Sequence, residues 1–299
     1  MKRVLITGAA GFIGTHTLGI LQAKGYEVHA VSARARVAQS GIEWHQADLL
    51  DSSSAGDLVQ RLRPSHLLHL AWVTAHGQFW AATENLAWVQ STLELMRHFA
   101  ENDGRRFVFA STCAVYDVSH GSLVEDLTPT KPANLYGSCK LAVENILQAF
   151  AAQTGLSAAS GRVFHLFGPS EDSRRFVPSI IIPLLQRRTA VCRNRDQILD
   201  FLYVEDVAAA FCALLESTEV GAVNFGSGTP IRLGEFAAKI ATKIGHDEGL
   251  ELQTDPTQKQ SVLTPDVTKL AQRIGWHPAF TLDNALDKTI EWWRAQPIT

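Results

Sequence analysis

The sequence lacks the residue patterns that mark several classes of protein. Its 299 residues include four cysteines, which lie far apart and show no C-x-x-C spacing. This spacing indicates reduced thiols rather than a disulfide framework or a zinc site, and no metal is expected. Lysine and arginine number 27 against 30 aspartates and glutamates, so the formal net charge is −3. Without a basic excess or a block of like charge, the chain is not expected to bind nucleic acid.

Long apolar runs are also missing. No stretch approaches the ~20 apolar residues that a membrane-spanning helix needs. The first residues, Met1-Lys2-Arg3-Val4, lead directly into a predicted strand and do not resemble a signal peptide. No internal repeat, low-complexity tract or long linker is visible. We therefore expect a cytoplasmic protein without a membrane partner, and a hydrophobic content of 46% is enough for a large core.

The most informative stretch covers residues 4–14, Val-Leu-Ile-Thr-Gly-Ala-Ala-Gly-Phe-Ile-Gly. Its apolar start predicts a buried strand, and its glycines predict a tight turn followed by a helix. The N–H groups and dipole at such a helix start bind phosphate groups, and glycine lets a pyrophosphate approach the backbone. The residues expected to form this site are Gly8, Gly11, Phe12, Ile13 and Gly14.

The next predicted strand, Val28–Val31, ends without an acidic residue. In NAD-binding Rossmann units a carboxylate at this point accepts hydrogen bonds from the adenosine ribose. Here Ser32 is followed by Arg34 and Arg36, so that no carboxylate repels a 2′-phosphate and two guanidinium groups can bind one. The alternative is a solvated basic loop. We favour NADP(H) as the cofactor, with NAD(H) as the alternative.

Two further patterns follow in order along the chain. A predicted strand over 107–110 ends in Ser-Thr-Cys at 111–113, and Tyr136 and Lys140 lie further on. Residues four apart lie on one face of a helix, and Pro132 indicates where that helix starts. Tyr-x-x-x-Lys alone is common by chance, but its position behind the glycine-rich turn and the Ser-Thr strand end makes it specific.

Together these motifs resemble the short-chain dehydrogenase/reductase superfamily, and Gly-Phe-Ile-Gly is similar to its extended branch, which modifies nucleotide sugars. The resemblance implies an α/β fold with a Rossmann-type doubly wound parallel sheet. It implies an NAD(P)-binding domain at 1–167 and 201–228, and a smaller C-terminal α/β substrate-binding domain at 168–200 and 229–299. It also implies a homodimer, in which the predicted helix over 80–100 and the Tyr136 helix form a four-helix bundle.

The resemblance also implies cofactor and substrate contacts. Trp72 replaces the family's alanine, and it either lies near the nicotinamide or sugar or simply packs the strand end. Leu199 stands where relatives carry an arginine that holds the diphosphate, so other arginines would supply that charge. The implied cofactor residues beyond the glycine turn are Ser32, Arg34, Asp48, Leu49, Leu70, Ala71, Ser111, Tyr136, Lys140 and Phe164. The implied substrate residues are Trp72, Thr112, Cys113, His165, Arg174 and Arg175.

The chemistry of the trio Thr112, Tyr136 and Lys140 follows from proton transfer. A free tyrosine has a pKa near ~10, and a nearby ammonium and the cofactor's positive charge are expected to lower it. Tyr136 then takes a proton from a sugar hydroxyl or gives one to a ketone, while Thr112 hydrogen-bonds the same oxygen. By resemblance, Lys140 also binds the nicotinamide ribose.

Three reactions share this trio. Dehydratases of the family carry Asp-Glu after the threonine, whereas this chain has Cys113 and Ala114, so dehydration is not expected. We favour a nucleotide-sugar 4-ketoreductase that acts on a 4-keto-6-deoxyhexose, with a UDP-hexose 4-epimerase as the alternative. A regulator that senses NADP without turnover is the alternative from another class, and relatives of that kind usually lack the Tyr-Lys pair.

Overall fold

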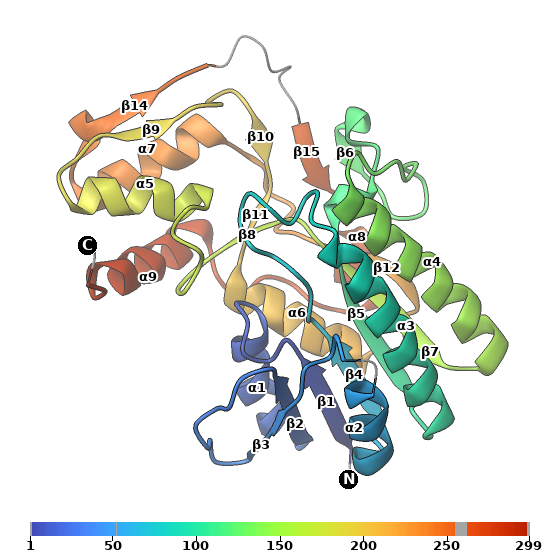
Figure 1. The fold of residues 1–299 in the computed structure, drawn as a ribbon. Helices are drawn as coiled ribbons and strands as arrows, with labels where there is room; N and C mark the ends of the chain where they lie inside the picture. Colours follow the sequence, from blue (N-terminus) through green and yellow to red (C-terminus); the bar gives the residue numbers. More distant parts are fainter. Residues whose placement is uncertain (1, 52, 255–261, 298–299) are drawn as a thin grey trace.

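The computed structural model describes residues 2–51, 53–254 and 262–297. Its centre is a parallel sheet of seven strands (Figure 1). The strands are β1 (Arg3–Thr7), β2 (Glu27–Ser32), β3 (Ile42–Gln46), β4 (His66–His69), β5 (Arg106–Thr112), β7 (Ser157–Val163) and β12 (Gly221–Phe225). They lie in the order β12-β7-β5-β4-β1-β2-β3, which confirms the predicted Rossmann-type sheet. The strand order reverses between β1 and β4, and such sheets bind ligands beyond the carboxyl ends of their strands at this point.

Helices cover both faces of this sheet. One face carries α1 (Gly14–Ala23), α6 (Val204–Glu216) and α8 (Thr268–Arg273), and the other carries α2 (Ser54–Leu62), α3 (Glu84–Glu101) and α4 (Leu135–Thr154). Neighbouring strand residues point to opposite faces, so Ile6 belongs to the first core and Leu5 to the second. Burial on both faces explains why the strands are continuous apolar runs.

A smaller part of the chain has its own core, and Figure 1 draws it above the sheet. Its helices are α5 (Phe176–Leu185), α7 (Leu233–Ile244) and α9 (Leu282–Arg294). Its two-stranded sheets pair β8 (His165–Phe167) with β11 (Phe201–Tyr203), and β9 (Ala190–Cys192) with β14 (Leu250–Leu252). A four-stranded sheet has the members β6 (Ser122–Leu123), β10 (Ile198–Leu199), β13 (Ile231–Arg232) and β15 (Val262–Pro265). Three short 3-10 helices are η1 (Cys113–Val115), η2 (Val118–His120) and η3 (Asp247–Gly249).

The helix expected over 80–100 begins four residues late, at Glu84. Leu86, expected on its buried face, is 57% exposed. The inward position in this first turn belongs to Asn85, whose amide donates 2.8 Å hydrogen bonds to the carbonyls of Phe79 and Ala82. The expectation for Leu86 was therefore wrong, because a polar side chain that holds the preceding loop occupies the buried position.

Among the helices that the structure describes, none is long and apolar enough to cross a membrane.

Candidate active site

At the glycine turn, the backbones of β1, α1 and the residues that follow β4 lie very close together. Gly8 has a φ of +66°, and a Cβ there would lie 2.7 Å from the backbone nitrogen of Ala71. A Cβ on Gly14 would lie 2.2 Å from the carbonyl oxygen of Gly8. The Gly11 N–H donates to that same oxygen at 2.9 Å. Both glycines are therefore required by packing within the protein, as well as by any ligand that approaches the turn.

The start of α1 faces a cavity of about 460 Å³, which we call the turn cavity. Ile13 is the N-cap of this helix and makes no side-chain capping hydrogen bond; the Thr15 and His16 N–H groups each donate to a carbonyl oxygen of the turn at 3.1 Å. The positive end of the helix dipole beside a glycine surface fits a diphosphate. The predicted cofactor residues in the cavity wall are Gly8, Gly11, Phe12, Ile13, Gly14, Leu70 and Ala71.

A second cavity of about 310 Å³, here called the Tyr136 cavity, gathers the predicted catalytic trio. Helix α4 supplies Tyr136 and Lys140, and the end of β5 supplies Thr112. The two cavities share Trp72 and Ile13 in their walls. The glycine turn and the trio, more than 90 residues apart in the sequence, thus open onto adjoining space.

Lys140 is held tightly by its surroundings. Its side chain is buried, and Nζ donates to the Ala110 carbonyl oxygen at 2.8 Å. Nζ also lies 3.8 Å from the centroid of the Trp72 ring and 5.9 Å from that of Tyr136. Burial lowers the pKa of Lys140 well below its usual range.

Tyr136 does not show the lowered pKa that was expected. Burial raises the pKa of Tyr136 to about 12, against the opposing effect of a hydrogen bond with the Thr112 side chain. The ring is packed edge-on against Phe79 and Trp80, with centroids 4.9 and 5.7 Å away. The expectation relied on a charged lysine and a bound cofactor; in the protein alone, desolvation outweighs both the hydrogen bond and the neighbouring charges.

Trp72 is fixed in place by neighbouring side chains. Its indole Nε1 donates to Asn85 Oδ1 at 2.8 Å, and its ring stacks with Trp88 at 6.2 Å between centroids. It also forms part of the wall of both cavities. Trp72 therefore packs the strand end and faces the candidate site at the same time.

The predicted substrate residues divide into two groups. Cys113, His165 and Arg175 line the Tyr136 cavity, as do the predicted cofactor residues Ser111 and Phe164. Arg174 does not line it: its guanidinium is largely exposed and binds both carboxylate oxygens of Asp172, at 2.9 and 2.7 Å. In the protein alone the charge of Arg174 is paired with Asp172 at the surface, and its contact with a substrate stays a prediction.

Two polar side chains in the wall of the Tyr136 cavity each have a buried atom that lacks a hydrogen-bond partner in the described part of the chain. Among the described residues, neither Glu171 Oε2 nor His165 Nδ1 has a hydrogen-bond partner. Burial raises the pKa of Glu171 to about 8 and lowers that of His165 to about 4, so both groups are disfavoured as ions. Buried polar atoms without partners indicate positions that a ligand can satisfy. Glu171 was missed in the sequence, since an acidic residue in a loop has the same pattern as a solvated surface residue.

The residues expected to bind the adenosine part of the cofactor lie outside the wall of the turn cavity. Ser32 ends β2, and its Oγ accepts a hydrogen bond from the Arg34 backbone N–H at 3.2 Å. The Arg36 guanidinium lies over the Trp44 ring at 5.9 Å. Asp48 Oδ1 accepts from the Leu50 N–H at 3.0 Å, and Leu49 is buried in the core. Ser32 and Arg34 lie at the carboxyl end of β2, next to the strand that carries the glycine turn.

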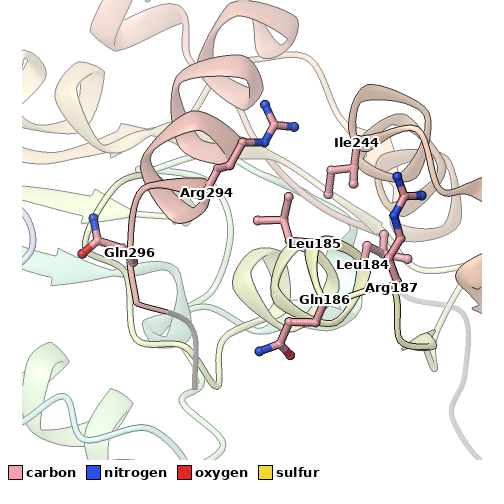
Figure 2. A pocket seen from close by; sticks show the side chains of 7 residues that line it. All are labelled: Leu184, Leu185, Gln186, Arg187, Ile244, Arg294 and Gln296. Carbon is pink, nitrogen blue, oxygen red and sulfur yellow. The ribbon is translucent and has the colours of Figure 1, made fainter.

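A separate hollow of about 390 Å³ lies between the ends of α5, α7 and α9. Figure 2 shows Leu185 between Arg294 on one side and Arg187 on the other. It shares no lining residue with the turn cavity or the Tyr136 cavity. The hollow therefore contains none of the residues predicted for the cofactor or the reaction.

Comparison with known proteins finds a matching family model and similar proteins over nearly the whole chain. The family model "NAD dependent epimerase/dehydratase family" matches residues 4–226. A UDP-glucuronic acid decarboxylase 1 from Xenopus tropicalis is 28% identical over 314 residues, covering 99% of this chain and 73% of the relative. A UDP-glucose 4-epimerase from Rhizobium meliloti is 26% identical and covers 97% of both chains. The solved UDP-glucose 4-epimerase of Thermus thermophilus, a complex with NAD, is 26% identical with a TM-score of 0.82, covering 98% of this chain and 99% of that one.

Proposed function

The chain belongs to the NAD dependent epimerase/dehydratase family, and from this premise we propose that it reduces the C4 ketone of a nucleotide-linked 4-keto-6-deoxyhexose. The gathering of Thr112, Tyr136 and Lys140 around one cavity beside the glycine turn supports hydride-transfer chemistry, and the end of β2, which suits an exchangeable NADP(H), carries the choice of reduction. Residues 1–167 and 201–228 would bind the cofactor, and residues 168–200 and 229–299 would hold the sugar nucleotide. The nicotinamide, when bound, supplies the hydride.

Proton supply is the task of Tyr136 in this proposal. Its hydroxyl gives a proton to O4 of the sugar, while the Thr112 hydroxyl donates a hydrogen bond to the same oxygen. A pKa raised to about 12 keeps Tyr136 protonated at neutral pH, which is the form that a reduction needs.

The walls of the Tyr136 cavity support a deoxy sugar. Trp72, Phe79, Trp80 and Phe176 present aromatic surface to the space beside Tyr136. These rings suit the methyl group at C6 of a deoxy sugar, while Glu171 and His165 in the same wall can hydrogen-bond the hydroxyl groups of the sugar.

The position after Thr112 disfavours dehydration. Cys113 takes the place of the acidic residue of dehydratases, and burial raises the pKa of its thiol to about 12. A neutral thiol followed by Ala114 offers neither the acid nor the base that elimination of water needs.

Cofactor preference is proposed from the end of β2. Ser32, Arg34 and Arg36 leave this end free of carboxylates, and both guanidinium groups are on exposed residues beside it. These residues support NADP(H), whose 2′-phosphate would pair with Arg34. NAD(H) stays the alternative, since the solved Thermus thermophilus relative is a complex with NAD.

A UDP-hexose 4-epimerase is the second candidate, and the similarity to the Rhizobium meliloti epimerase favours it. An epimerase needs the same trio but keeps its cofactor and returns the hydride to the same carbon. Reduction of a ketone instead consumes one cofactor in each turnover.

Spectrophotometry at 340 nm with added NADPH separates these candidates. The substrates would be a nucleotide-linked 4-keto-6-deoxyhexose, UDP-glucose and UDP-glucuronic acid. We expect stoichiometric loss of NADPH with the keto sugar alone. Conversion of UDP-glucose to its C4 epimer without loss of NADPH would establish the epimerase instead, and NADPH binding without turnover of any substrate would indicate a regulator.

A further inference from the structure

A cluster of two histidines and a glutamate lies at the edge of the central sheet, apart from both cavities. His29 belongs to β2, and Glu43 and His45 belong to the edge strand β3. The strand register places His29 directly opposite Glu43, and His45 follows Glu43 by two residues. Side chains two apart on a strand point to the same face. All three are therefore fixed by the sheet itself on one face.

The ligand-type atoms of the cluster are spaced for one metal ion. His29 Nδ1 lies 2.9 Å from His45 Nε2 and 3.5 Å from a carboxylate oxygen of Glu43. His45 Nε2 lies 3.6 Å from the other Glu43 oxygen. Tetrahedral Zn²⁺ with bonds of about 2.0–2.1 Å separates neighbouring ligand atoms by about 3.3 Å. The observed separations bracket that value, so small side-chain movements would complete the geometry.

A fourth residue fixes the orientation of the buried histidine. Glu27 Oε1 accepts a hydrogen bond from His29 Nε2 at 3.0 Å, and Arg3 holds the same carboxylate at 3.0 Å. With its proton on Nε2, His29 directs the Nδ1 lone pair at the centre of the cluster. A carboxylate behind a metal-binding imidazole is a common arrangement, because it fixes the tautomer and increases the basicity of the ligand.

Exposure differs across the cluster in a way that allows an ion to enter. The side chains of His29 and His45 are 3% and 9% exposed, whereas that of Glu43 is 62% exposed. The two buried imidazoles thus form a preorganised floor of the site, and the Glu43 carboxylate lies on its solvent side. A water molecule on that side can take the fourth position.

We propose that His29, Glu43 and His45 bind one Zn²⁺ ion and thereby tie the edge strand β3 to β2. In the metal-free protein the Nε2–H of His45 donates to Nδ1 of His29. When Zn²⁺ binds Nε2 of His45, the proton on Nε2 passes to solvent and Nδ1 takes up a proton from solvent, so the ring stays neutral. Imidazole and carboxylate ligands favour Zn²⁺ over Mg²⁺ or Ca²⁺, which prefer all-oxygen sites.

Isothermal titration calorimetry of chelator-stripped, tag-free protein with Zn²⁺ tests this proposal. We expect binding at one equivalent, and at least tenfold weaker binding by Glu43→Gln and His45→Gln. Glu27→Gln, which leaves the three ligands intact, should weaken binding by about tenfold. Because Glu43 is exposed, its variant should fold normally, which circular dichroism would verify.

The matched control is His246→Gln, which disrupts another histidine–glutamate pair, His246 Nδ1 with Glu248 Oε1 at 2.9 Å. It should bind Zn²⁺ as the wild type does. Co²⁺ in place of Zn²⁺ should give the intense visible bands of a tetrahedral site in the wild type and lose them in His45→Gln. Wild-type protein without stoichiometric Zn²⁺ binding, or binding equal in wild type and Glu43→Gln, would overturn the proposal.

Discussion

Single side chains at the end of β2 set the expected cofactor preference. Arg34 follows Ser32, which accepts a hydrogen bond from the Arg34 backbone, and no carboxylate stands at this strand end. A charge-assisted contact from Arg34 to a 2′-phosphate is worth roughly 1.5–3 kcal/mol, or about tenfold to more than a hundredfold in affinity. Arg34→Ala should lose that much affinity for NADPH and little for NADH, as measured by fluorescence titration of both cofactors.

Arg174→Ala is the control for this measurement, because Arg174 pairs with Asp172 at the surface. It should leave both affinities unchanged. Tighter binding of NADH than NADPH by the wild type would refute the NADP preference.

Glu171 is expected to make the stability of the protein depend on pH. Burial raises its pKa from 4.5 to about 8 in the folded state. The native protein therefore keeps a proton that the unfolded chain releases, and folding stability falls as pH rises from about 4.5 to 8. Glu171→Gln removes this titration, so its Tm should exceed that of the wild type at pH 9 and approach it at pH 5.

Scanning calorimetry at both pH values measures the effect. Exposed Glu235→Gln should follow the wild type at each pH. A difference in Tm between Glu171→Gln and the wild type that is the same at pH 5 and pH 9 would contradict the burial of an ionisable carboxyl.

At the scale of elements, the junction of β1 and α1 depends on the absence of side chains. A Cβ at Gly14 would meet the Gly8 carbonyl oxygen at 2.2 Å, whereas a Cβ at Gly19, in the same helix, meets nothing within 4 Å. Gly14→Ala should lower stability by ~1–3 kcal/mol through overpacking and weaken cofactor binding. Gly19→Ala should raise stability by ~0.5–1 kcal/mol, because alanine loses less chain entropy in a helix.

Denaturant unfolding of both variants gives the comparison. Equal effects of the two substitutions would show that the turn tolerates a side chain, and the packing derived for Gly8 and Gly14 would then be wrong.

The sequence alone predicted those elements whose residue pattern lies within one short stretch of the chain. The apolar runs gave the strands, and the glycine turn and the Tyr-x-x-x-Lys spacing gave the site that the fold assembles. Helix α3 was less well predicted, because Asn85 is buried by partners in a loop that periodicity does not show. Glu171 and the His29 cluster were missed for a related reason. Their environment is created by segments that meet only in the folded chain.

At the scale of the whole molecule, we propose a homodimer formed by α3 and α4. Each helix leaves a large apolar side chain exposed: Leu86 is 57% and Ile146 is 40% exposed. The double variant Leu86→Arg with Ile146→Arg should place charges in that interface and yield monomers. Size-exclusion chromatography with light scattering measures the mass.

Leu127→Arg is the control, since Leu127 is 80% exposed but lies outside these helices. It should leave the mass unchanged. A wild-type protein that is monomeric at micromolar concentration, or a dimer that survives the double substitution, would exclude this interface.

The most direct test of the proposed reaction follows a labelled hydride. The protein would be incubated with NADPH carrying deuterium at both hydrogen positions of nicotinamide C4, together with a nucleotide-linked 4-keto-6-deoxyhexose. We expect a product with one deuterium at C4 of the sugar by mass spectrometry and NMR.

Tyr136→Phe should bind NADPH normally but form this product ~10²–10⁴-fold more slowly, because the proton donor is gone. Tyr26→Phe removes a hydroxyl that has no partner among the described residues and should keep the wild-type rate. Unlabelled product, or a Tyr136→Phe rate above about a tenth of the wild-type rate, would contradict the account.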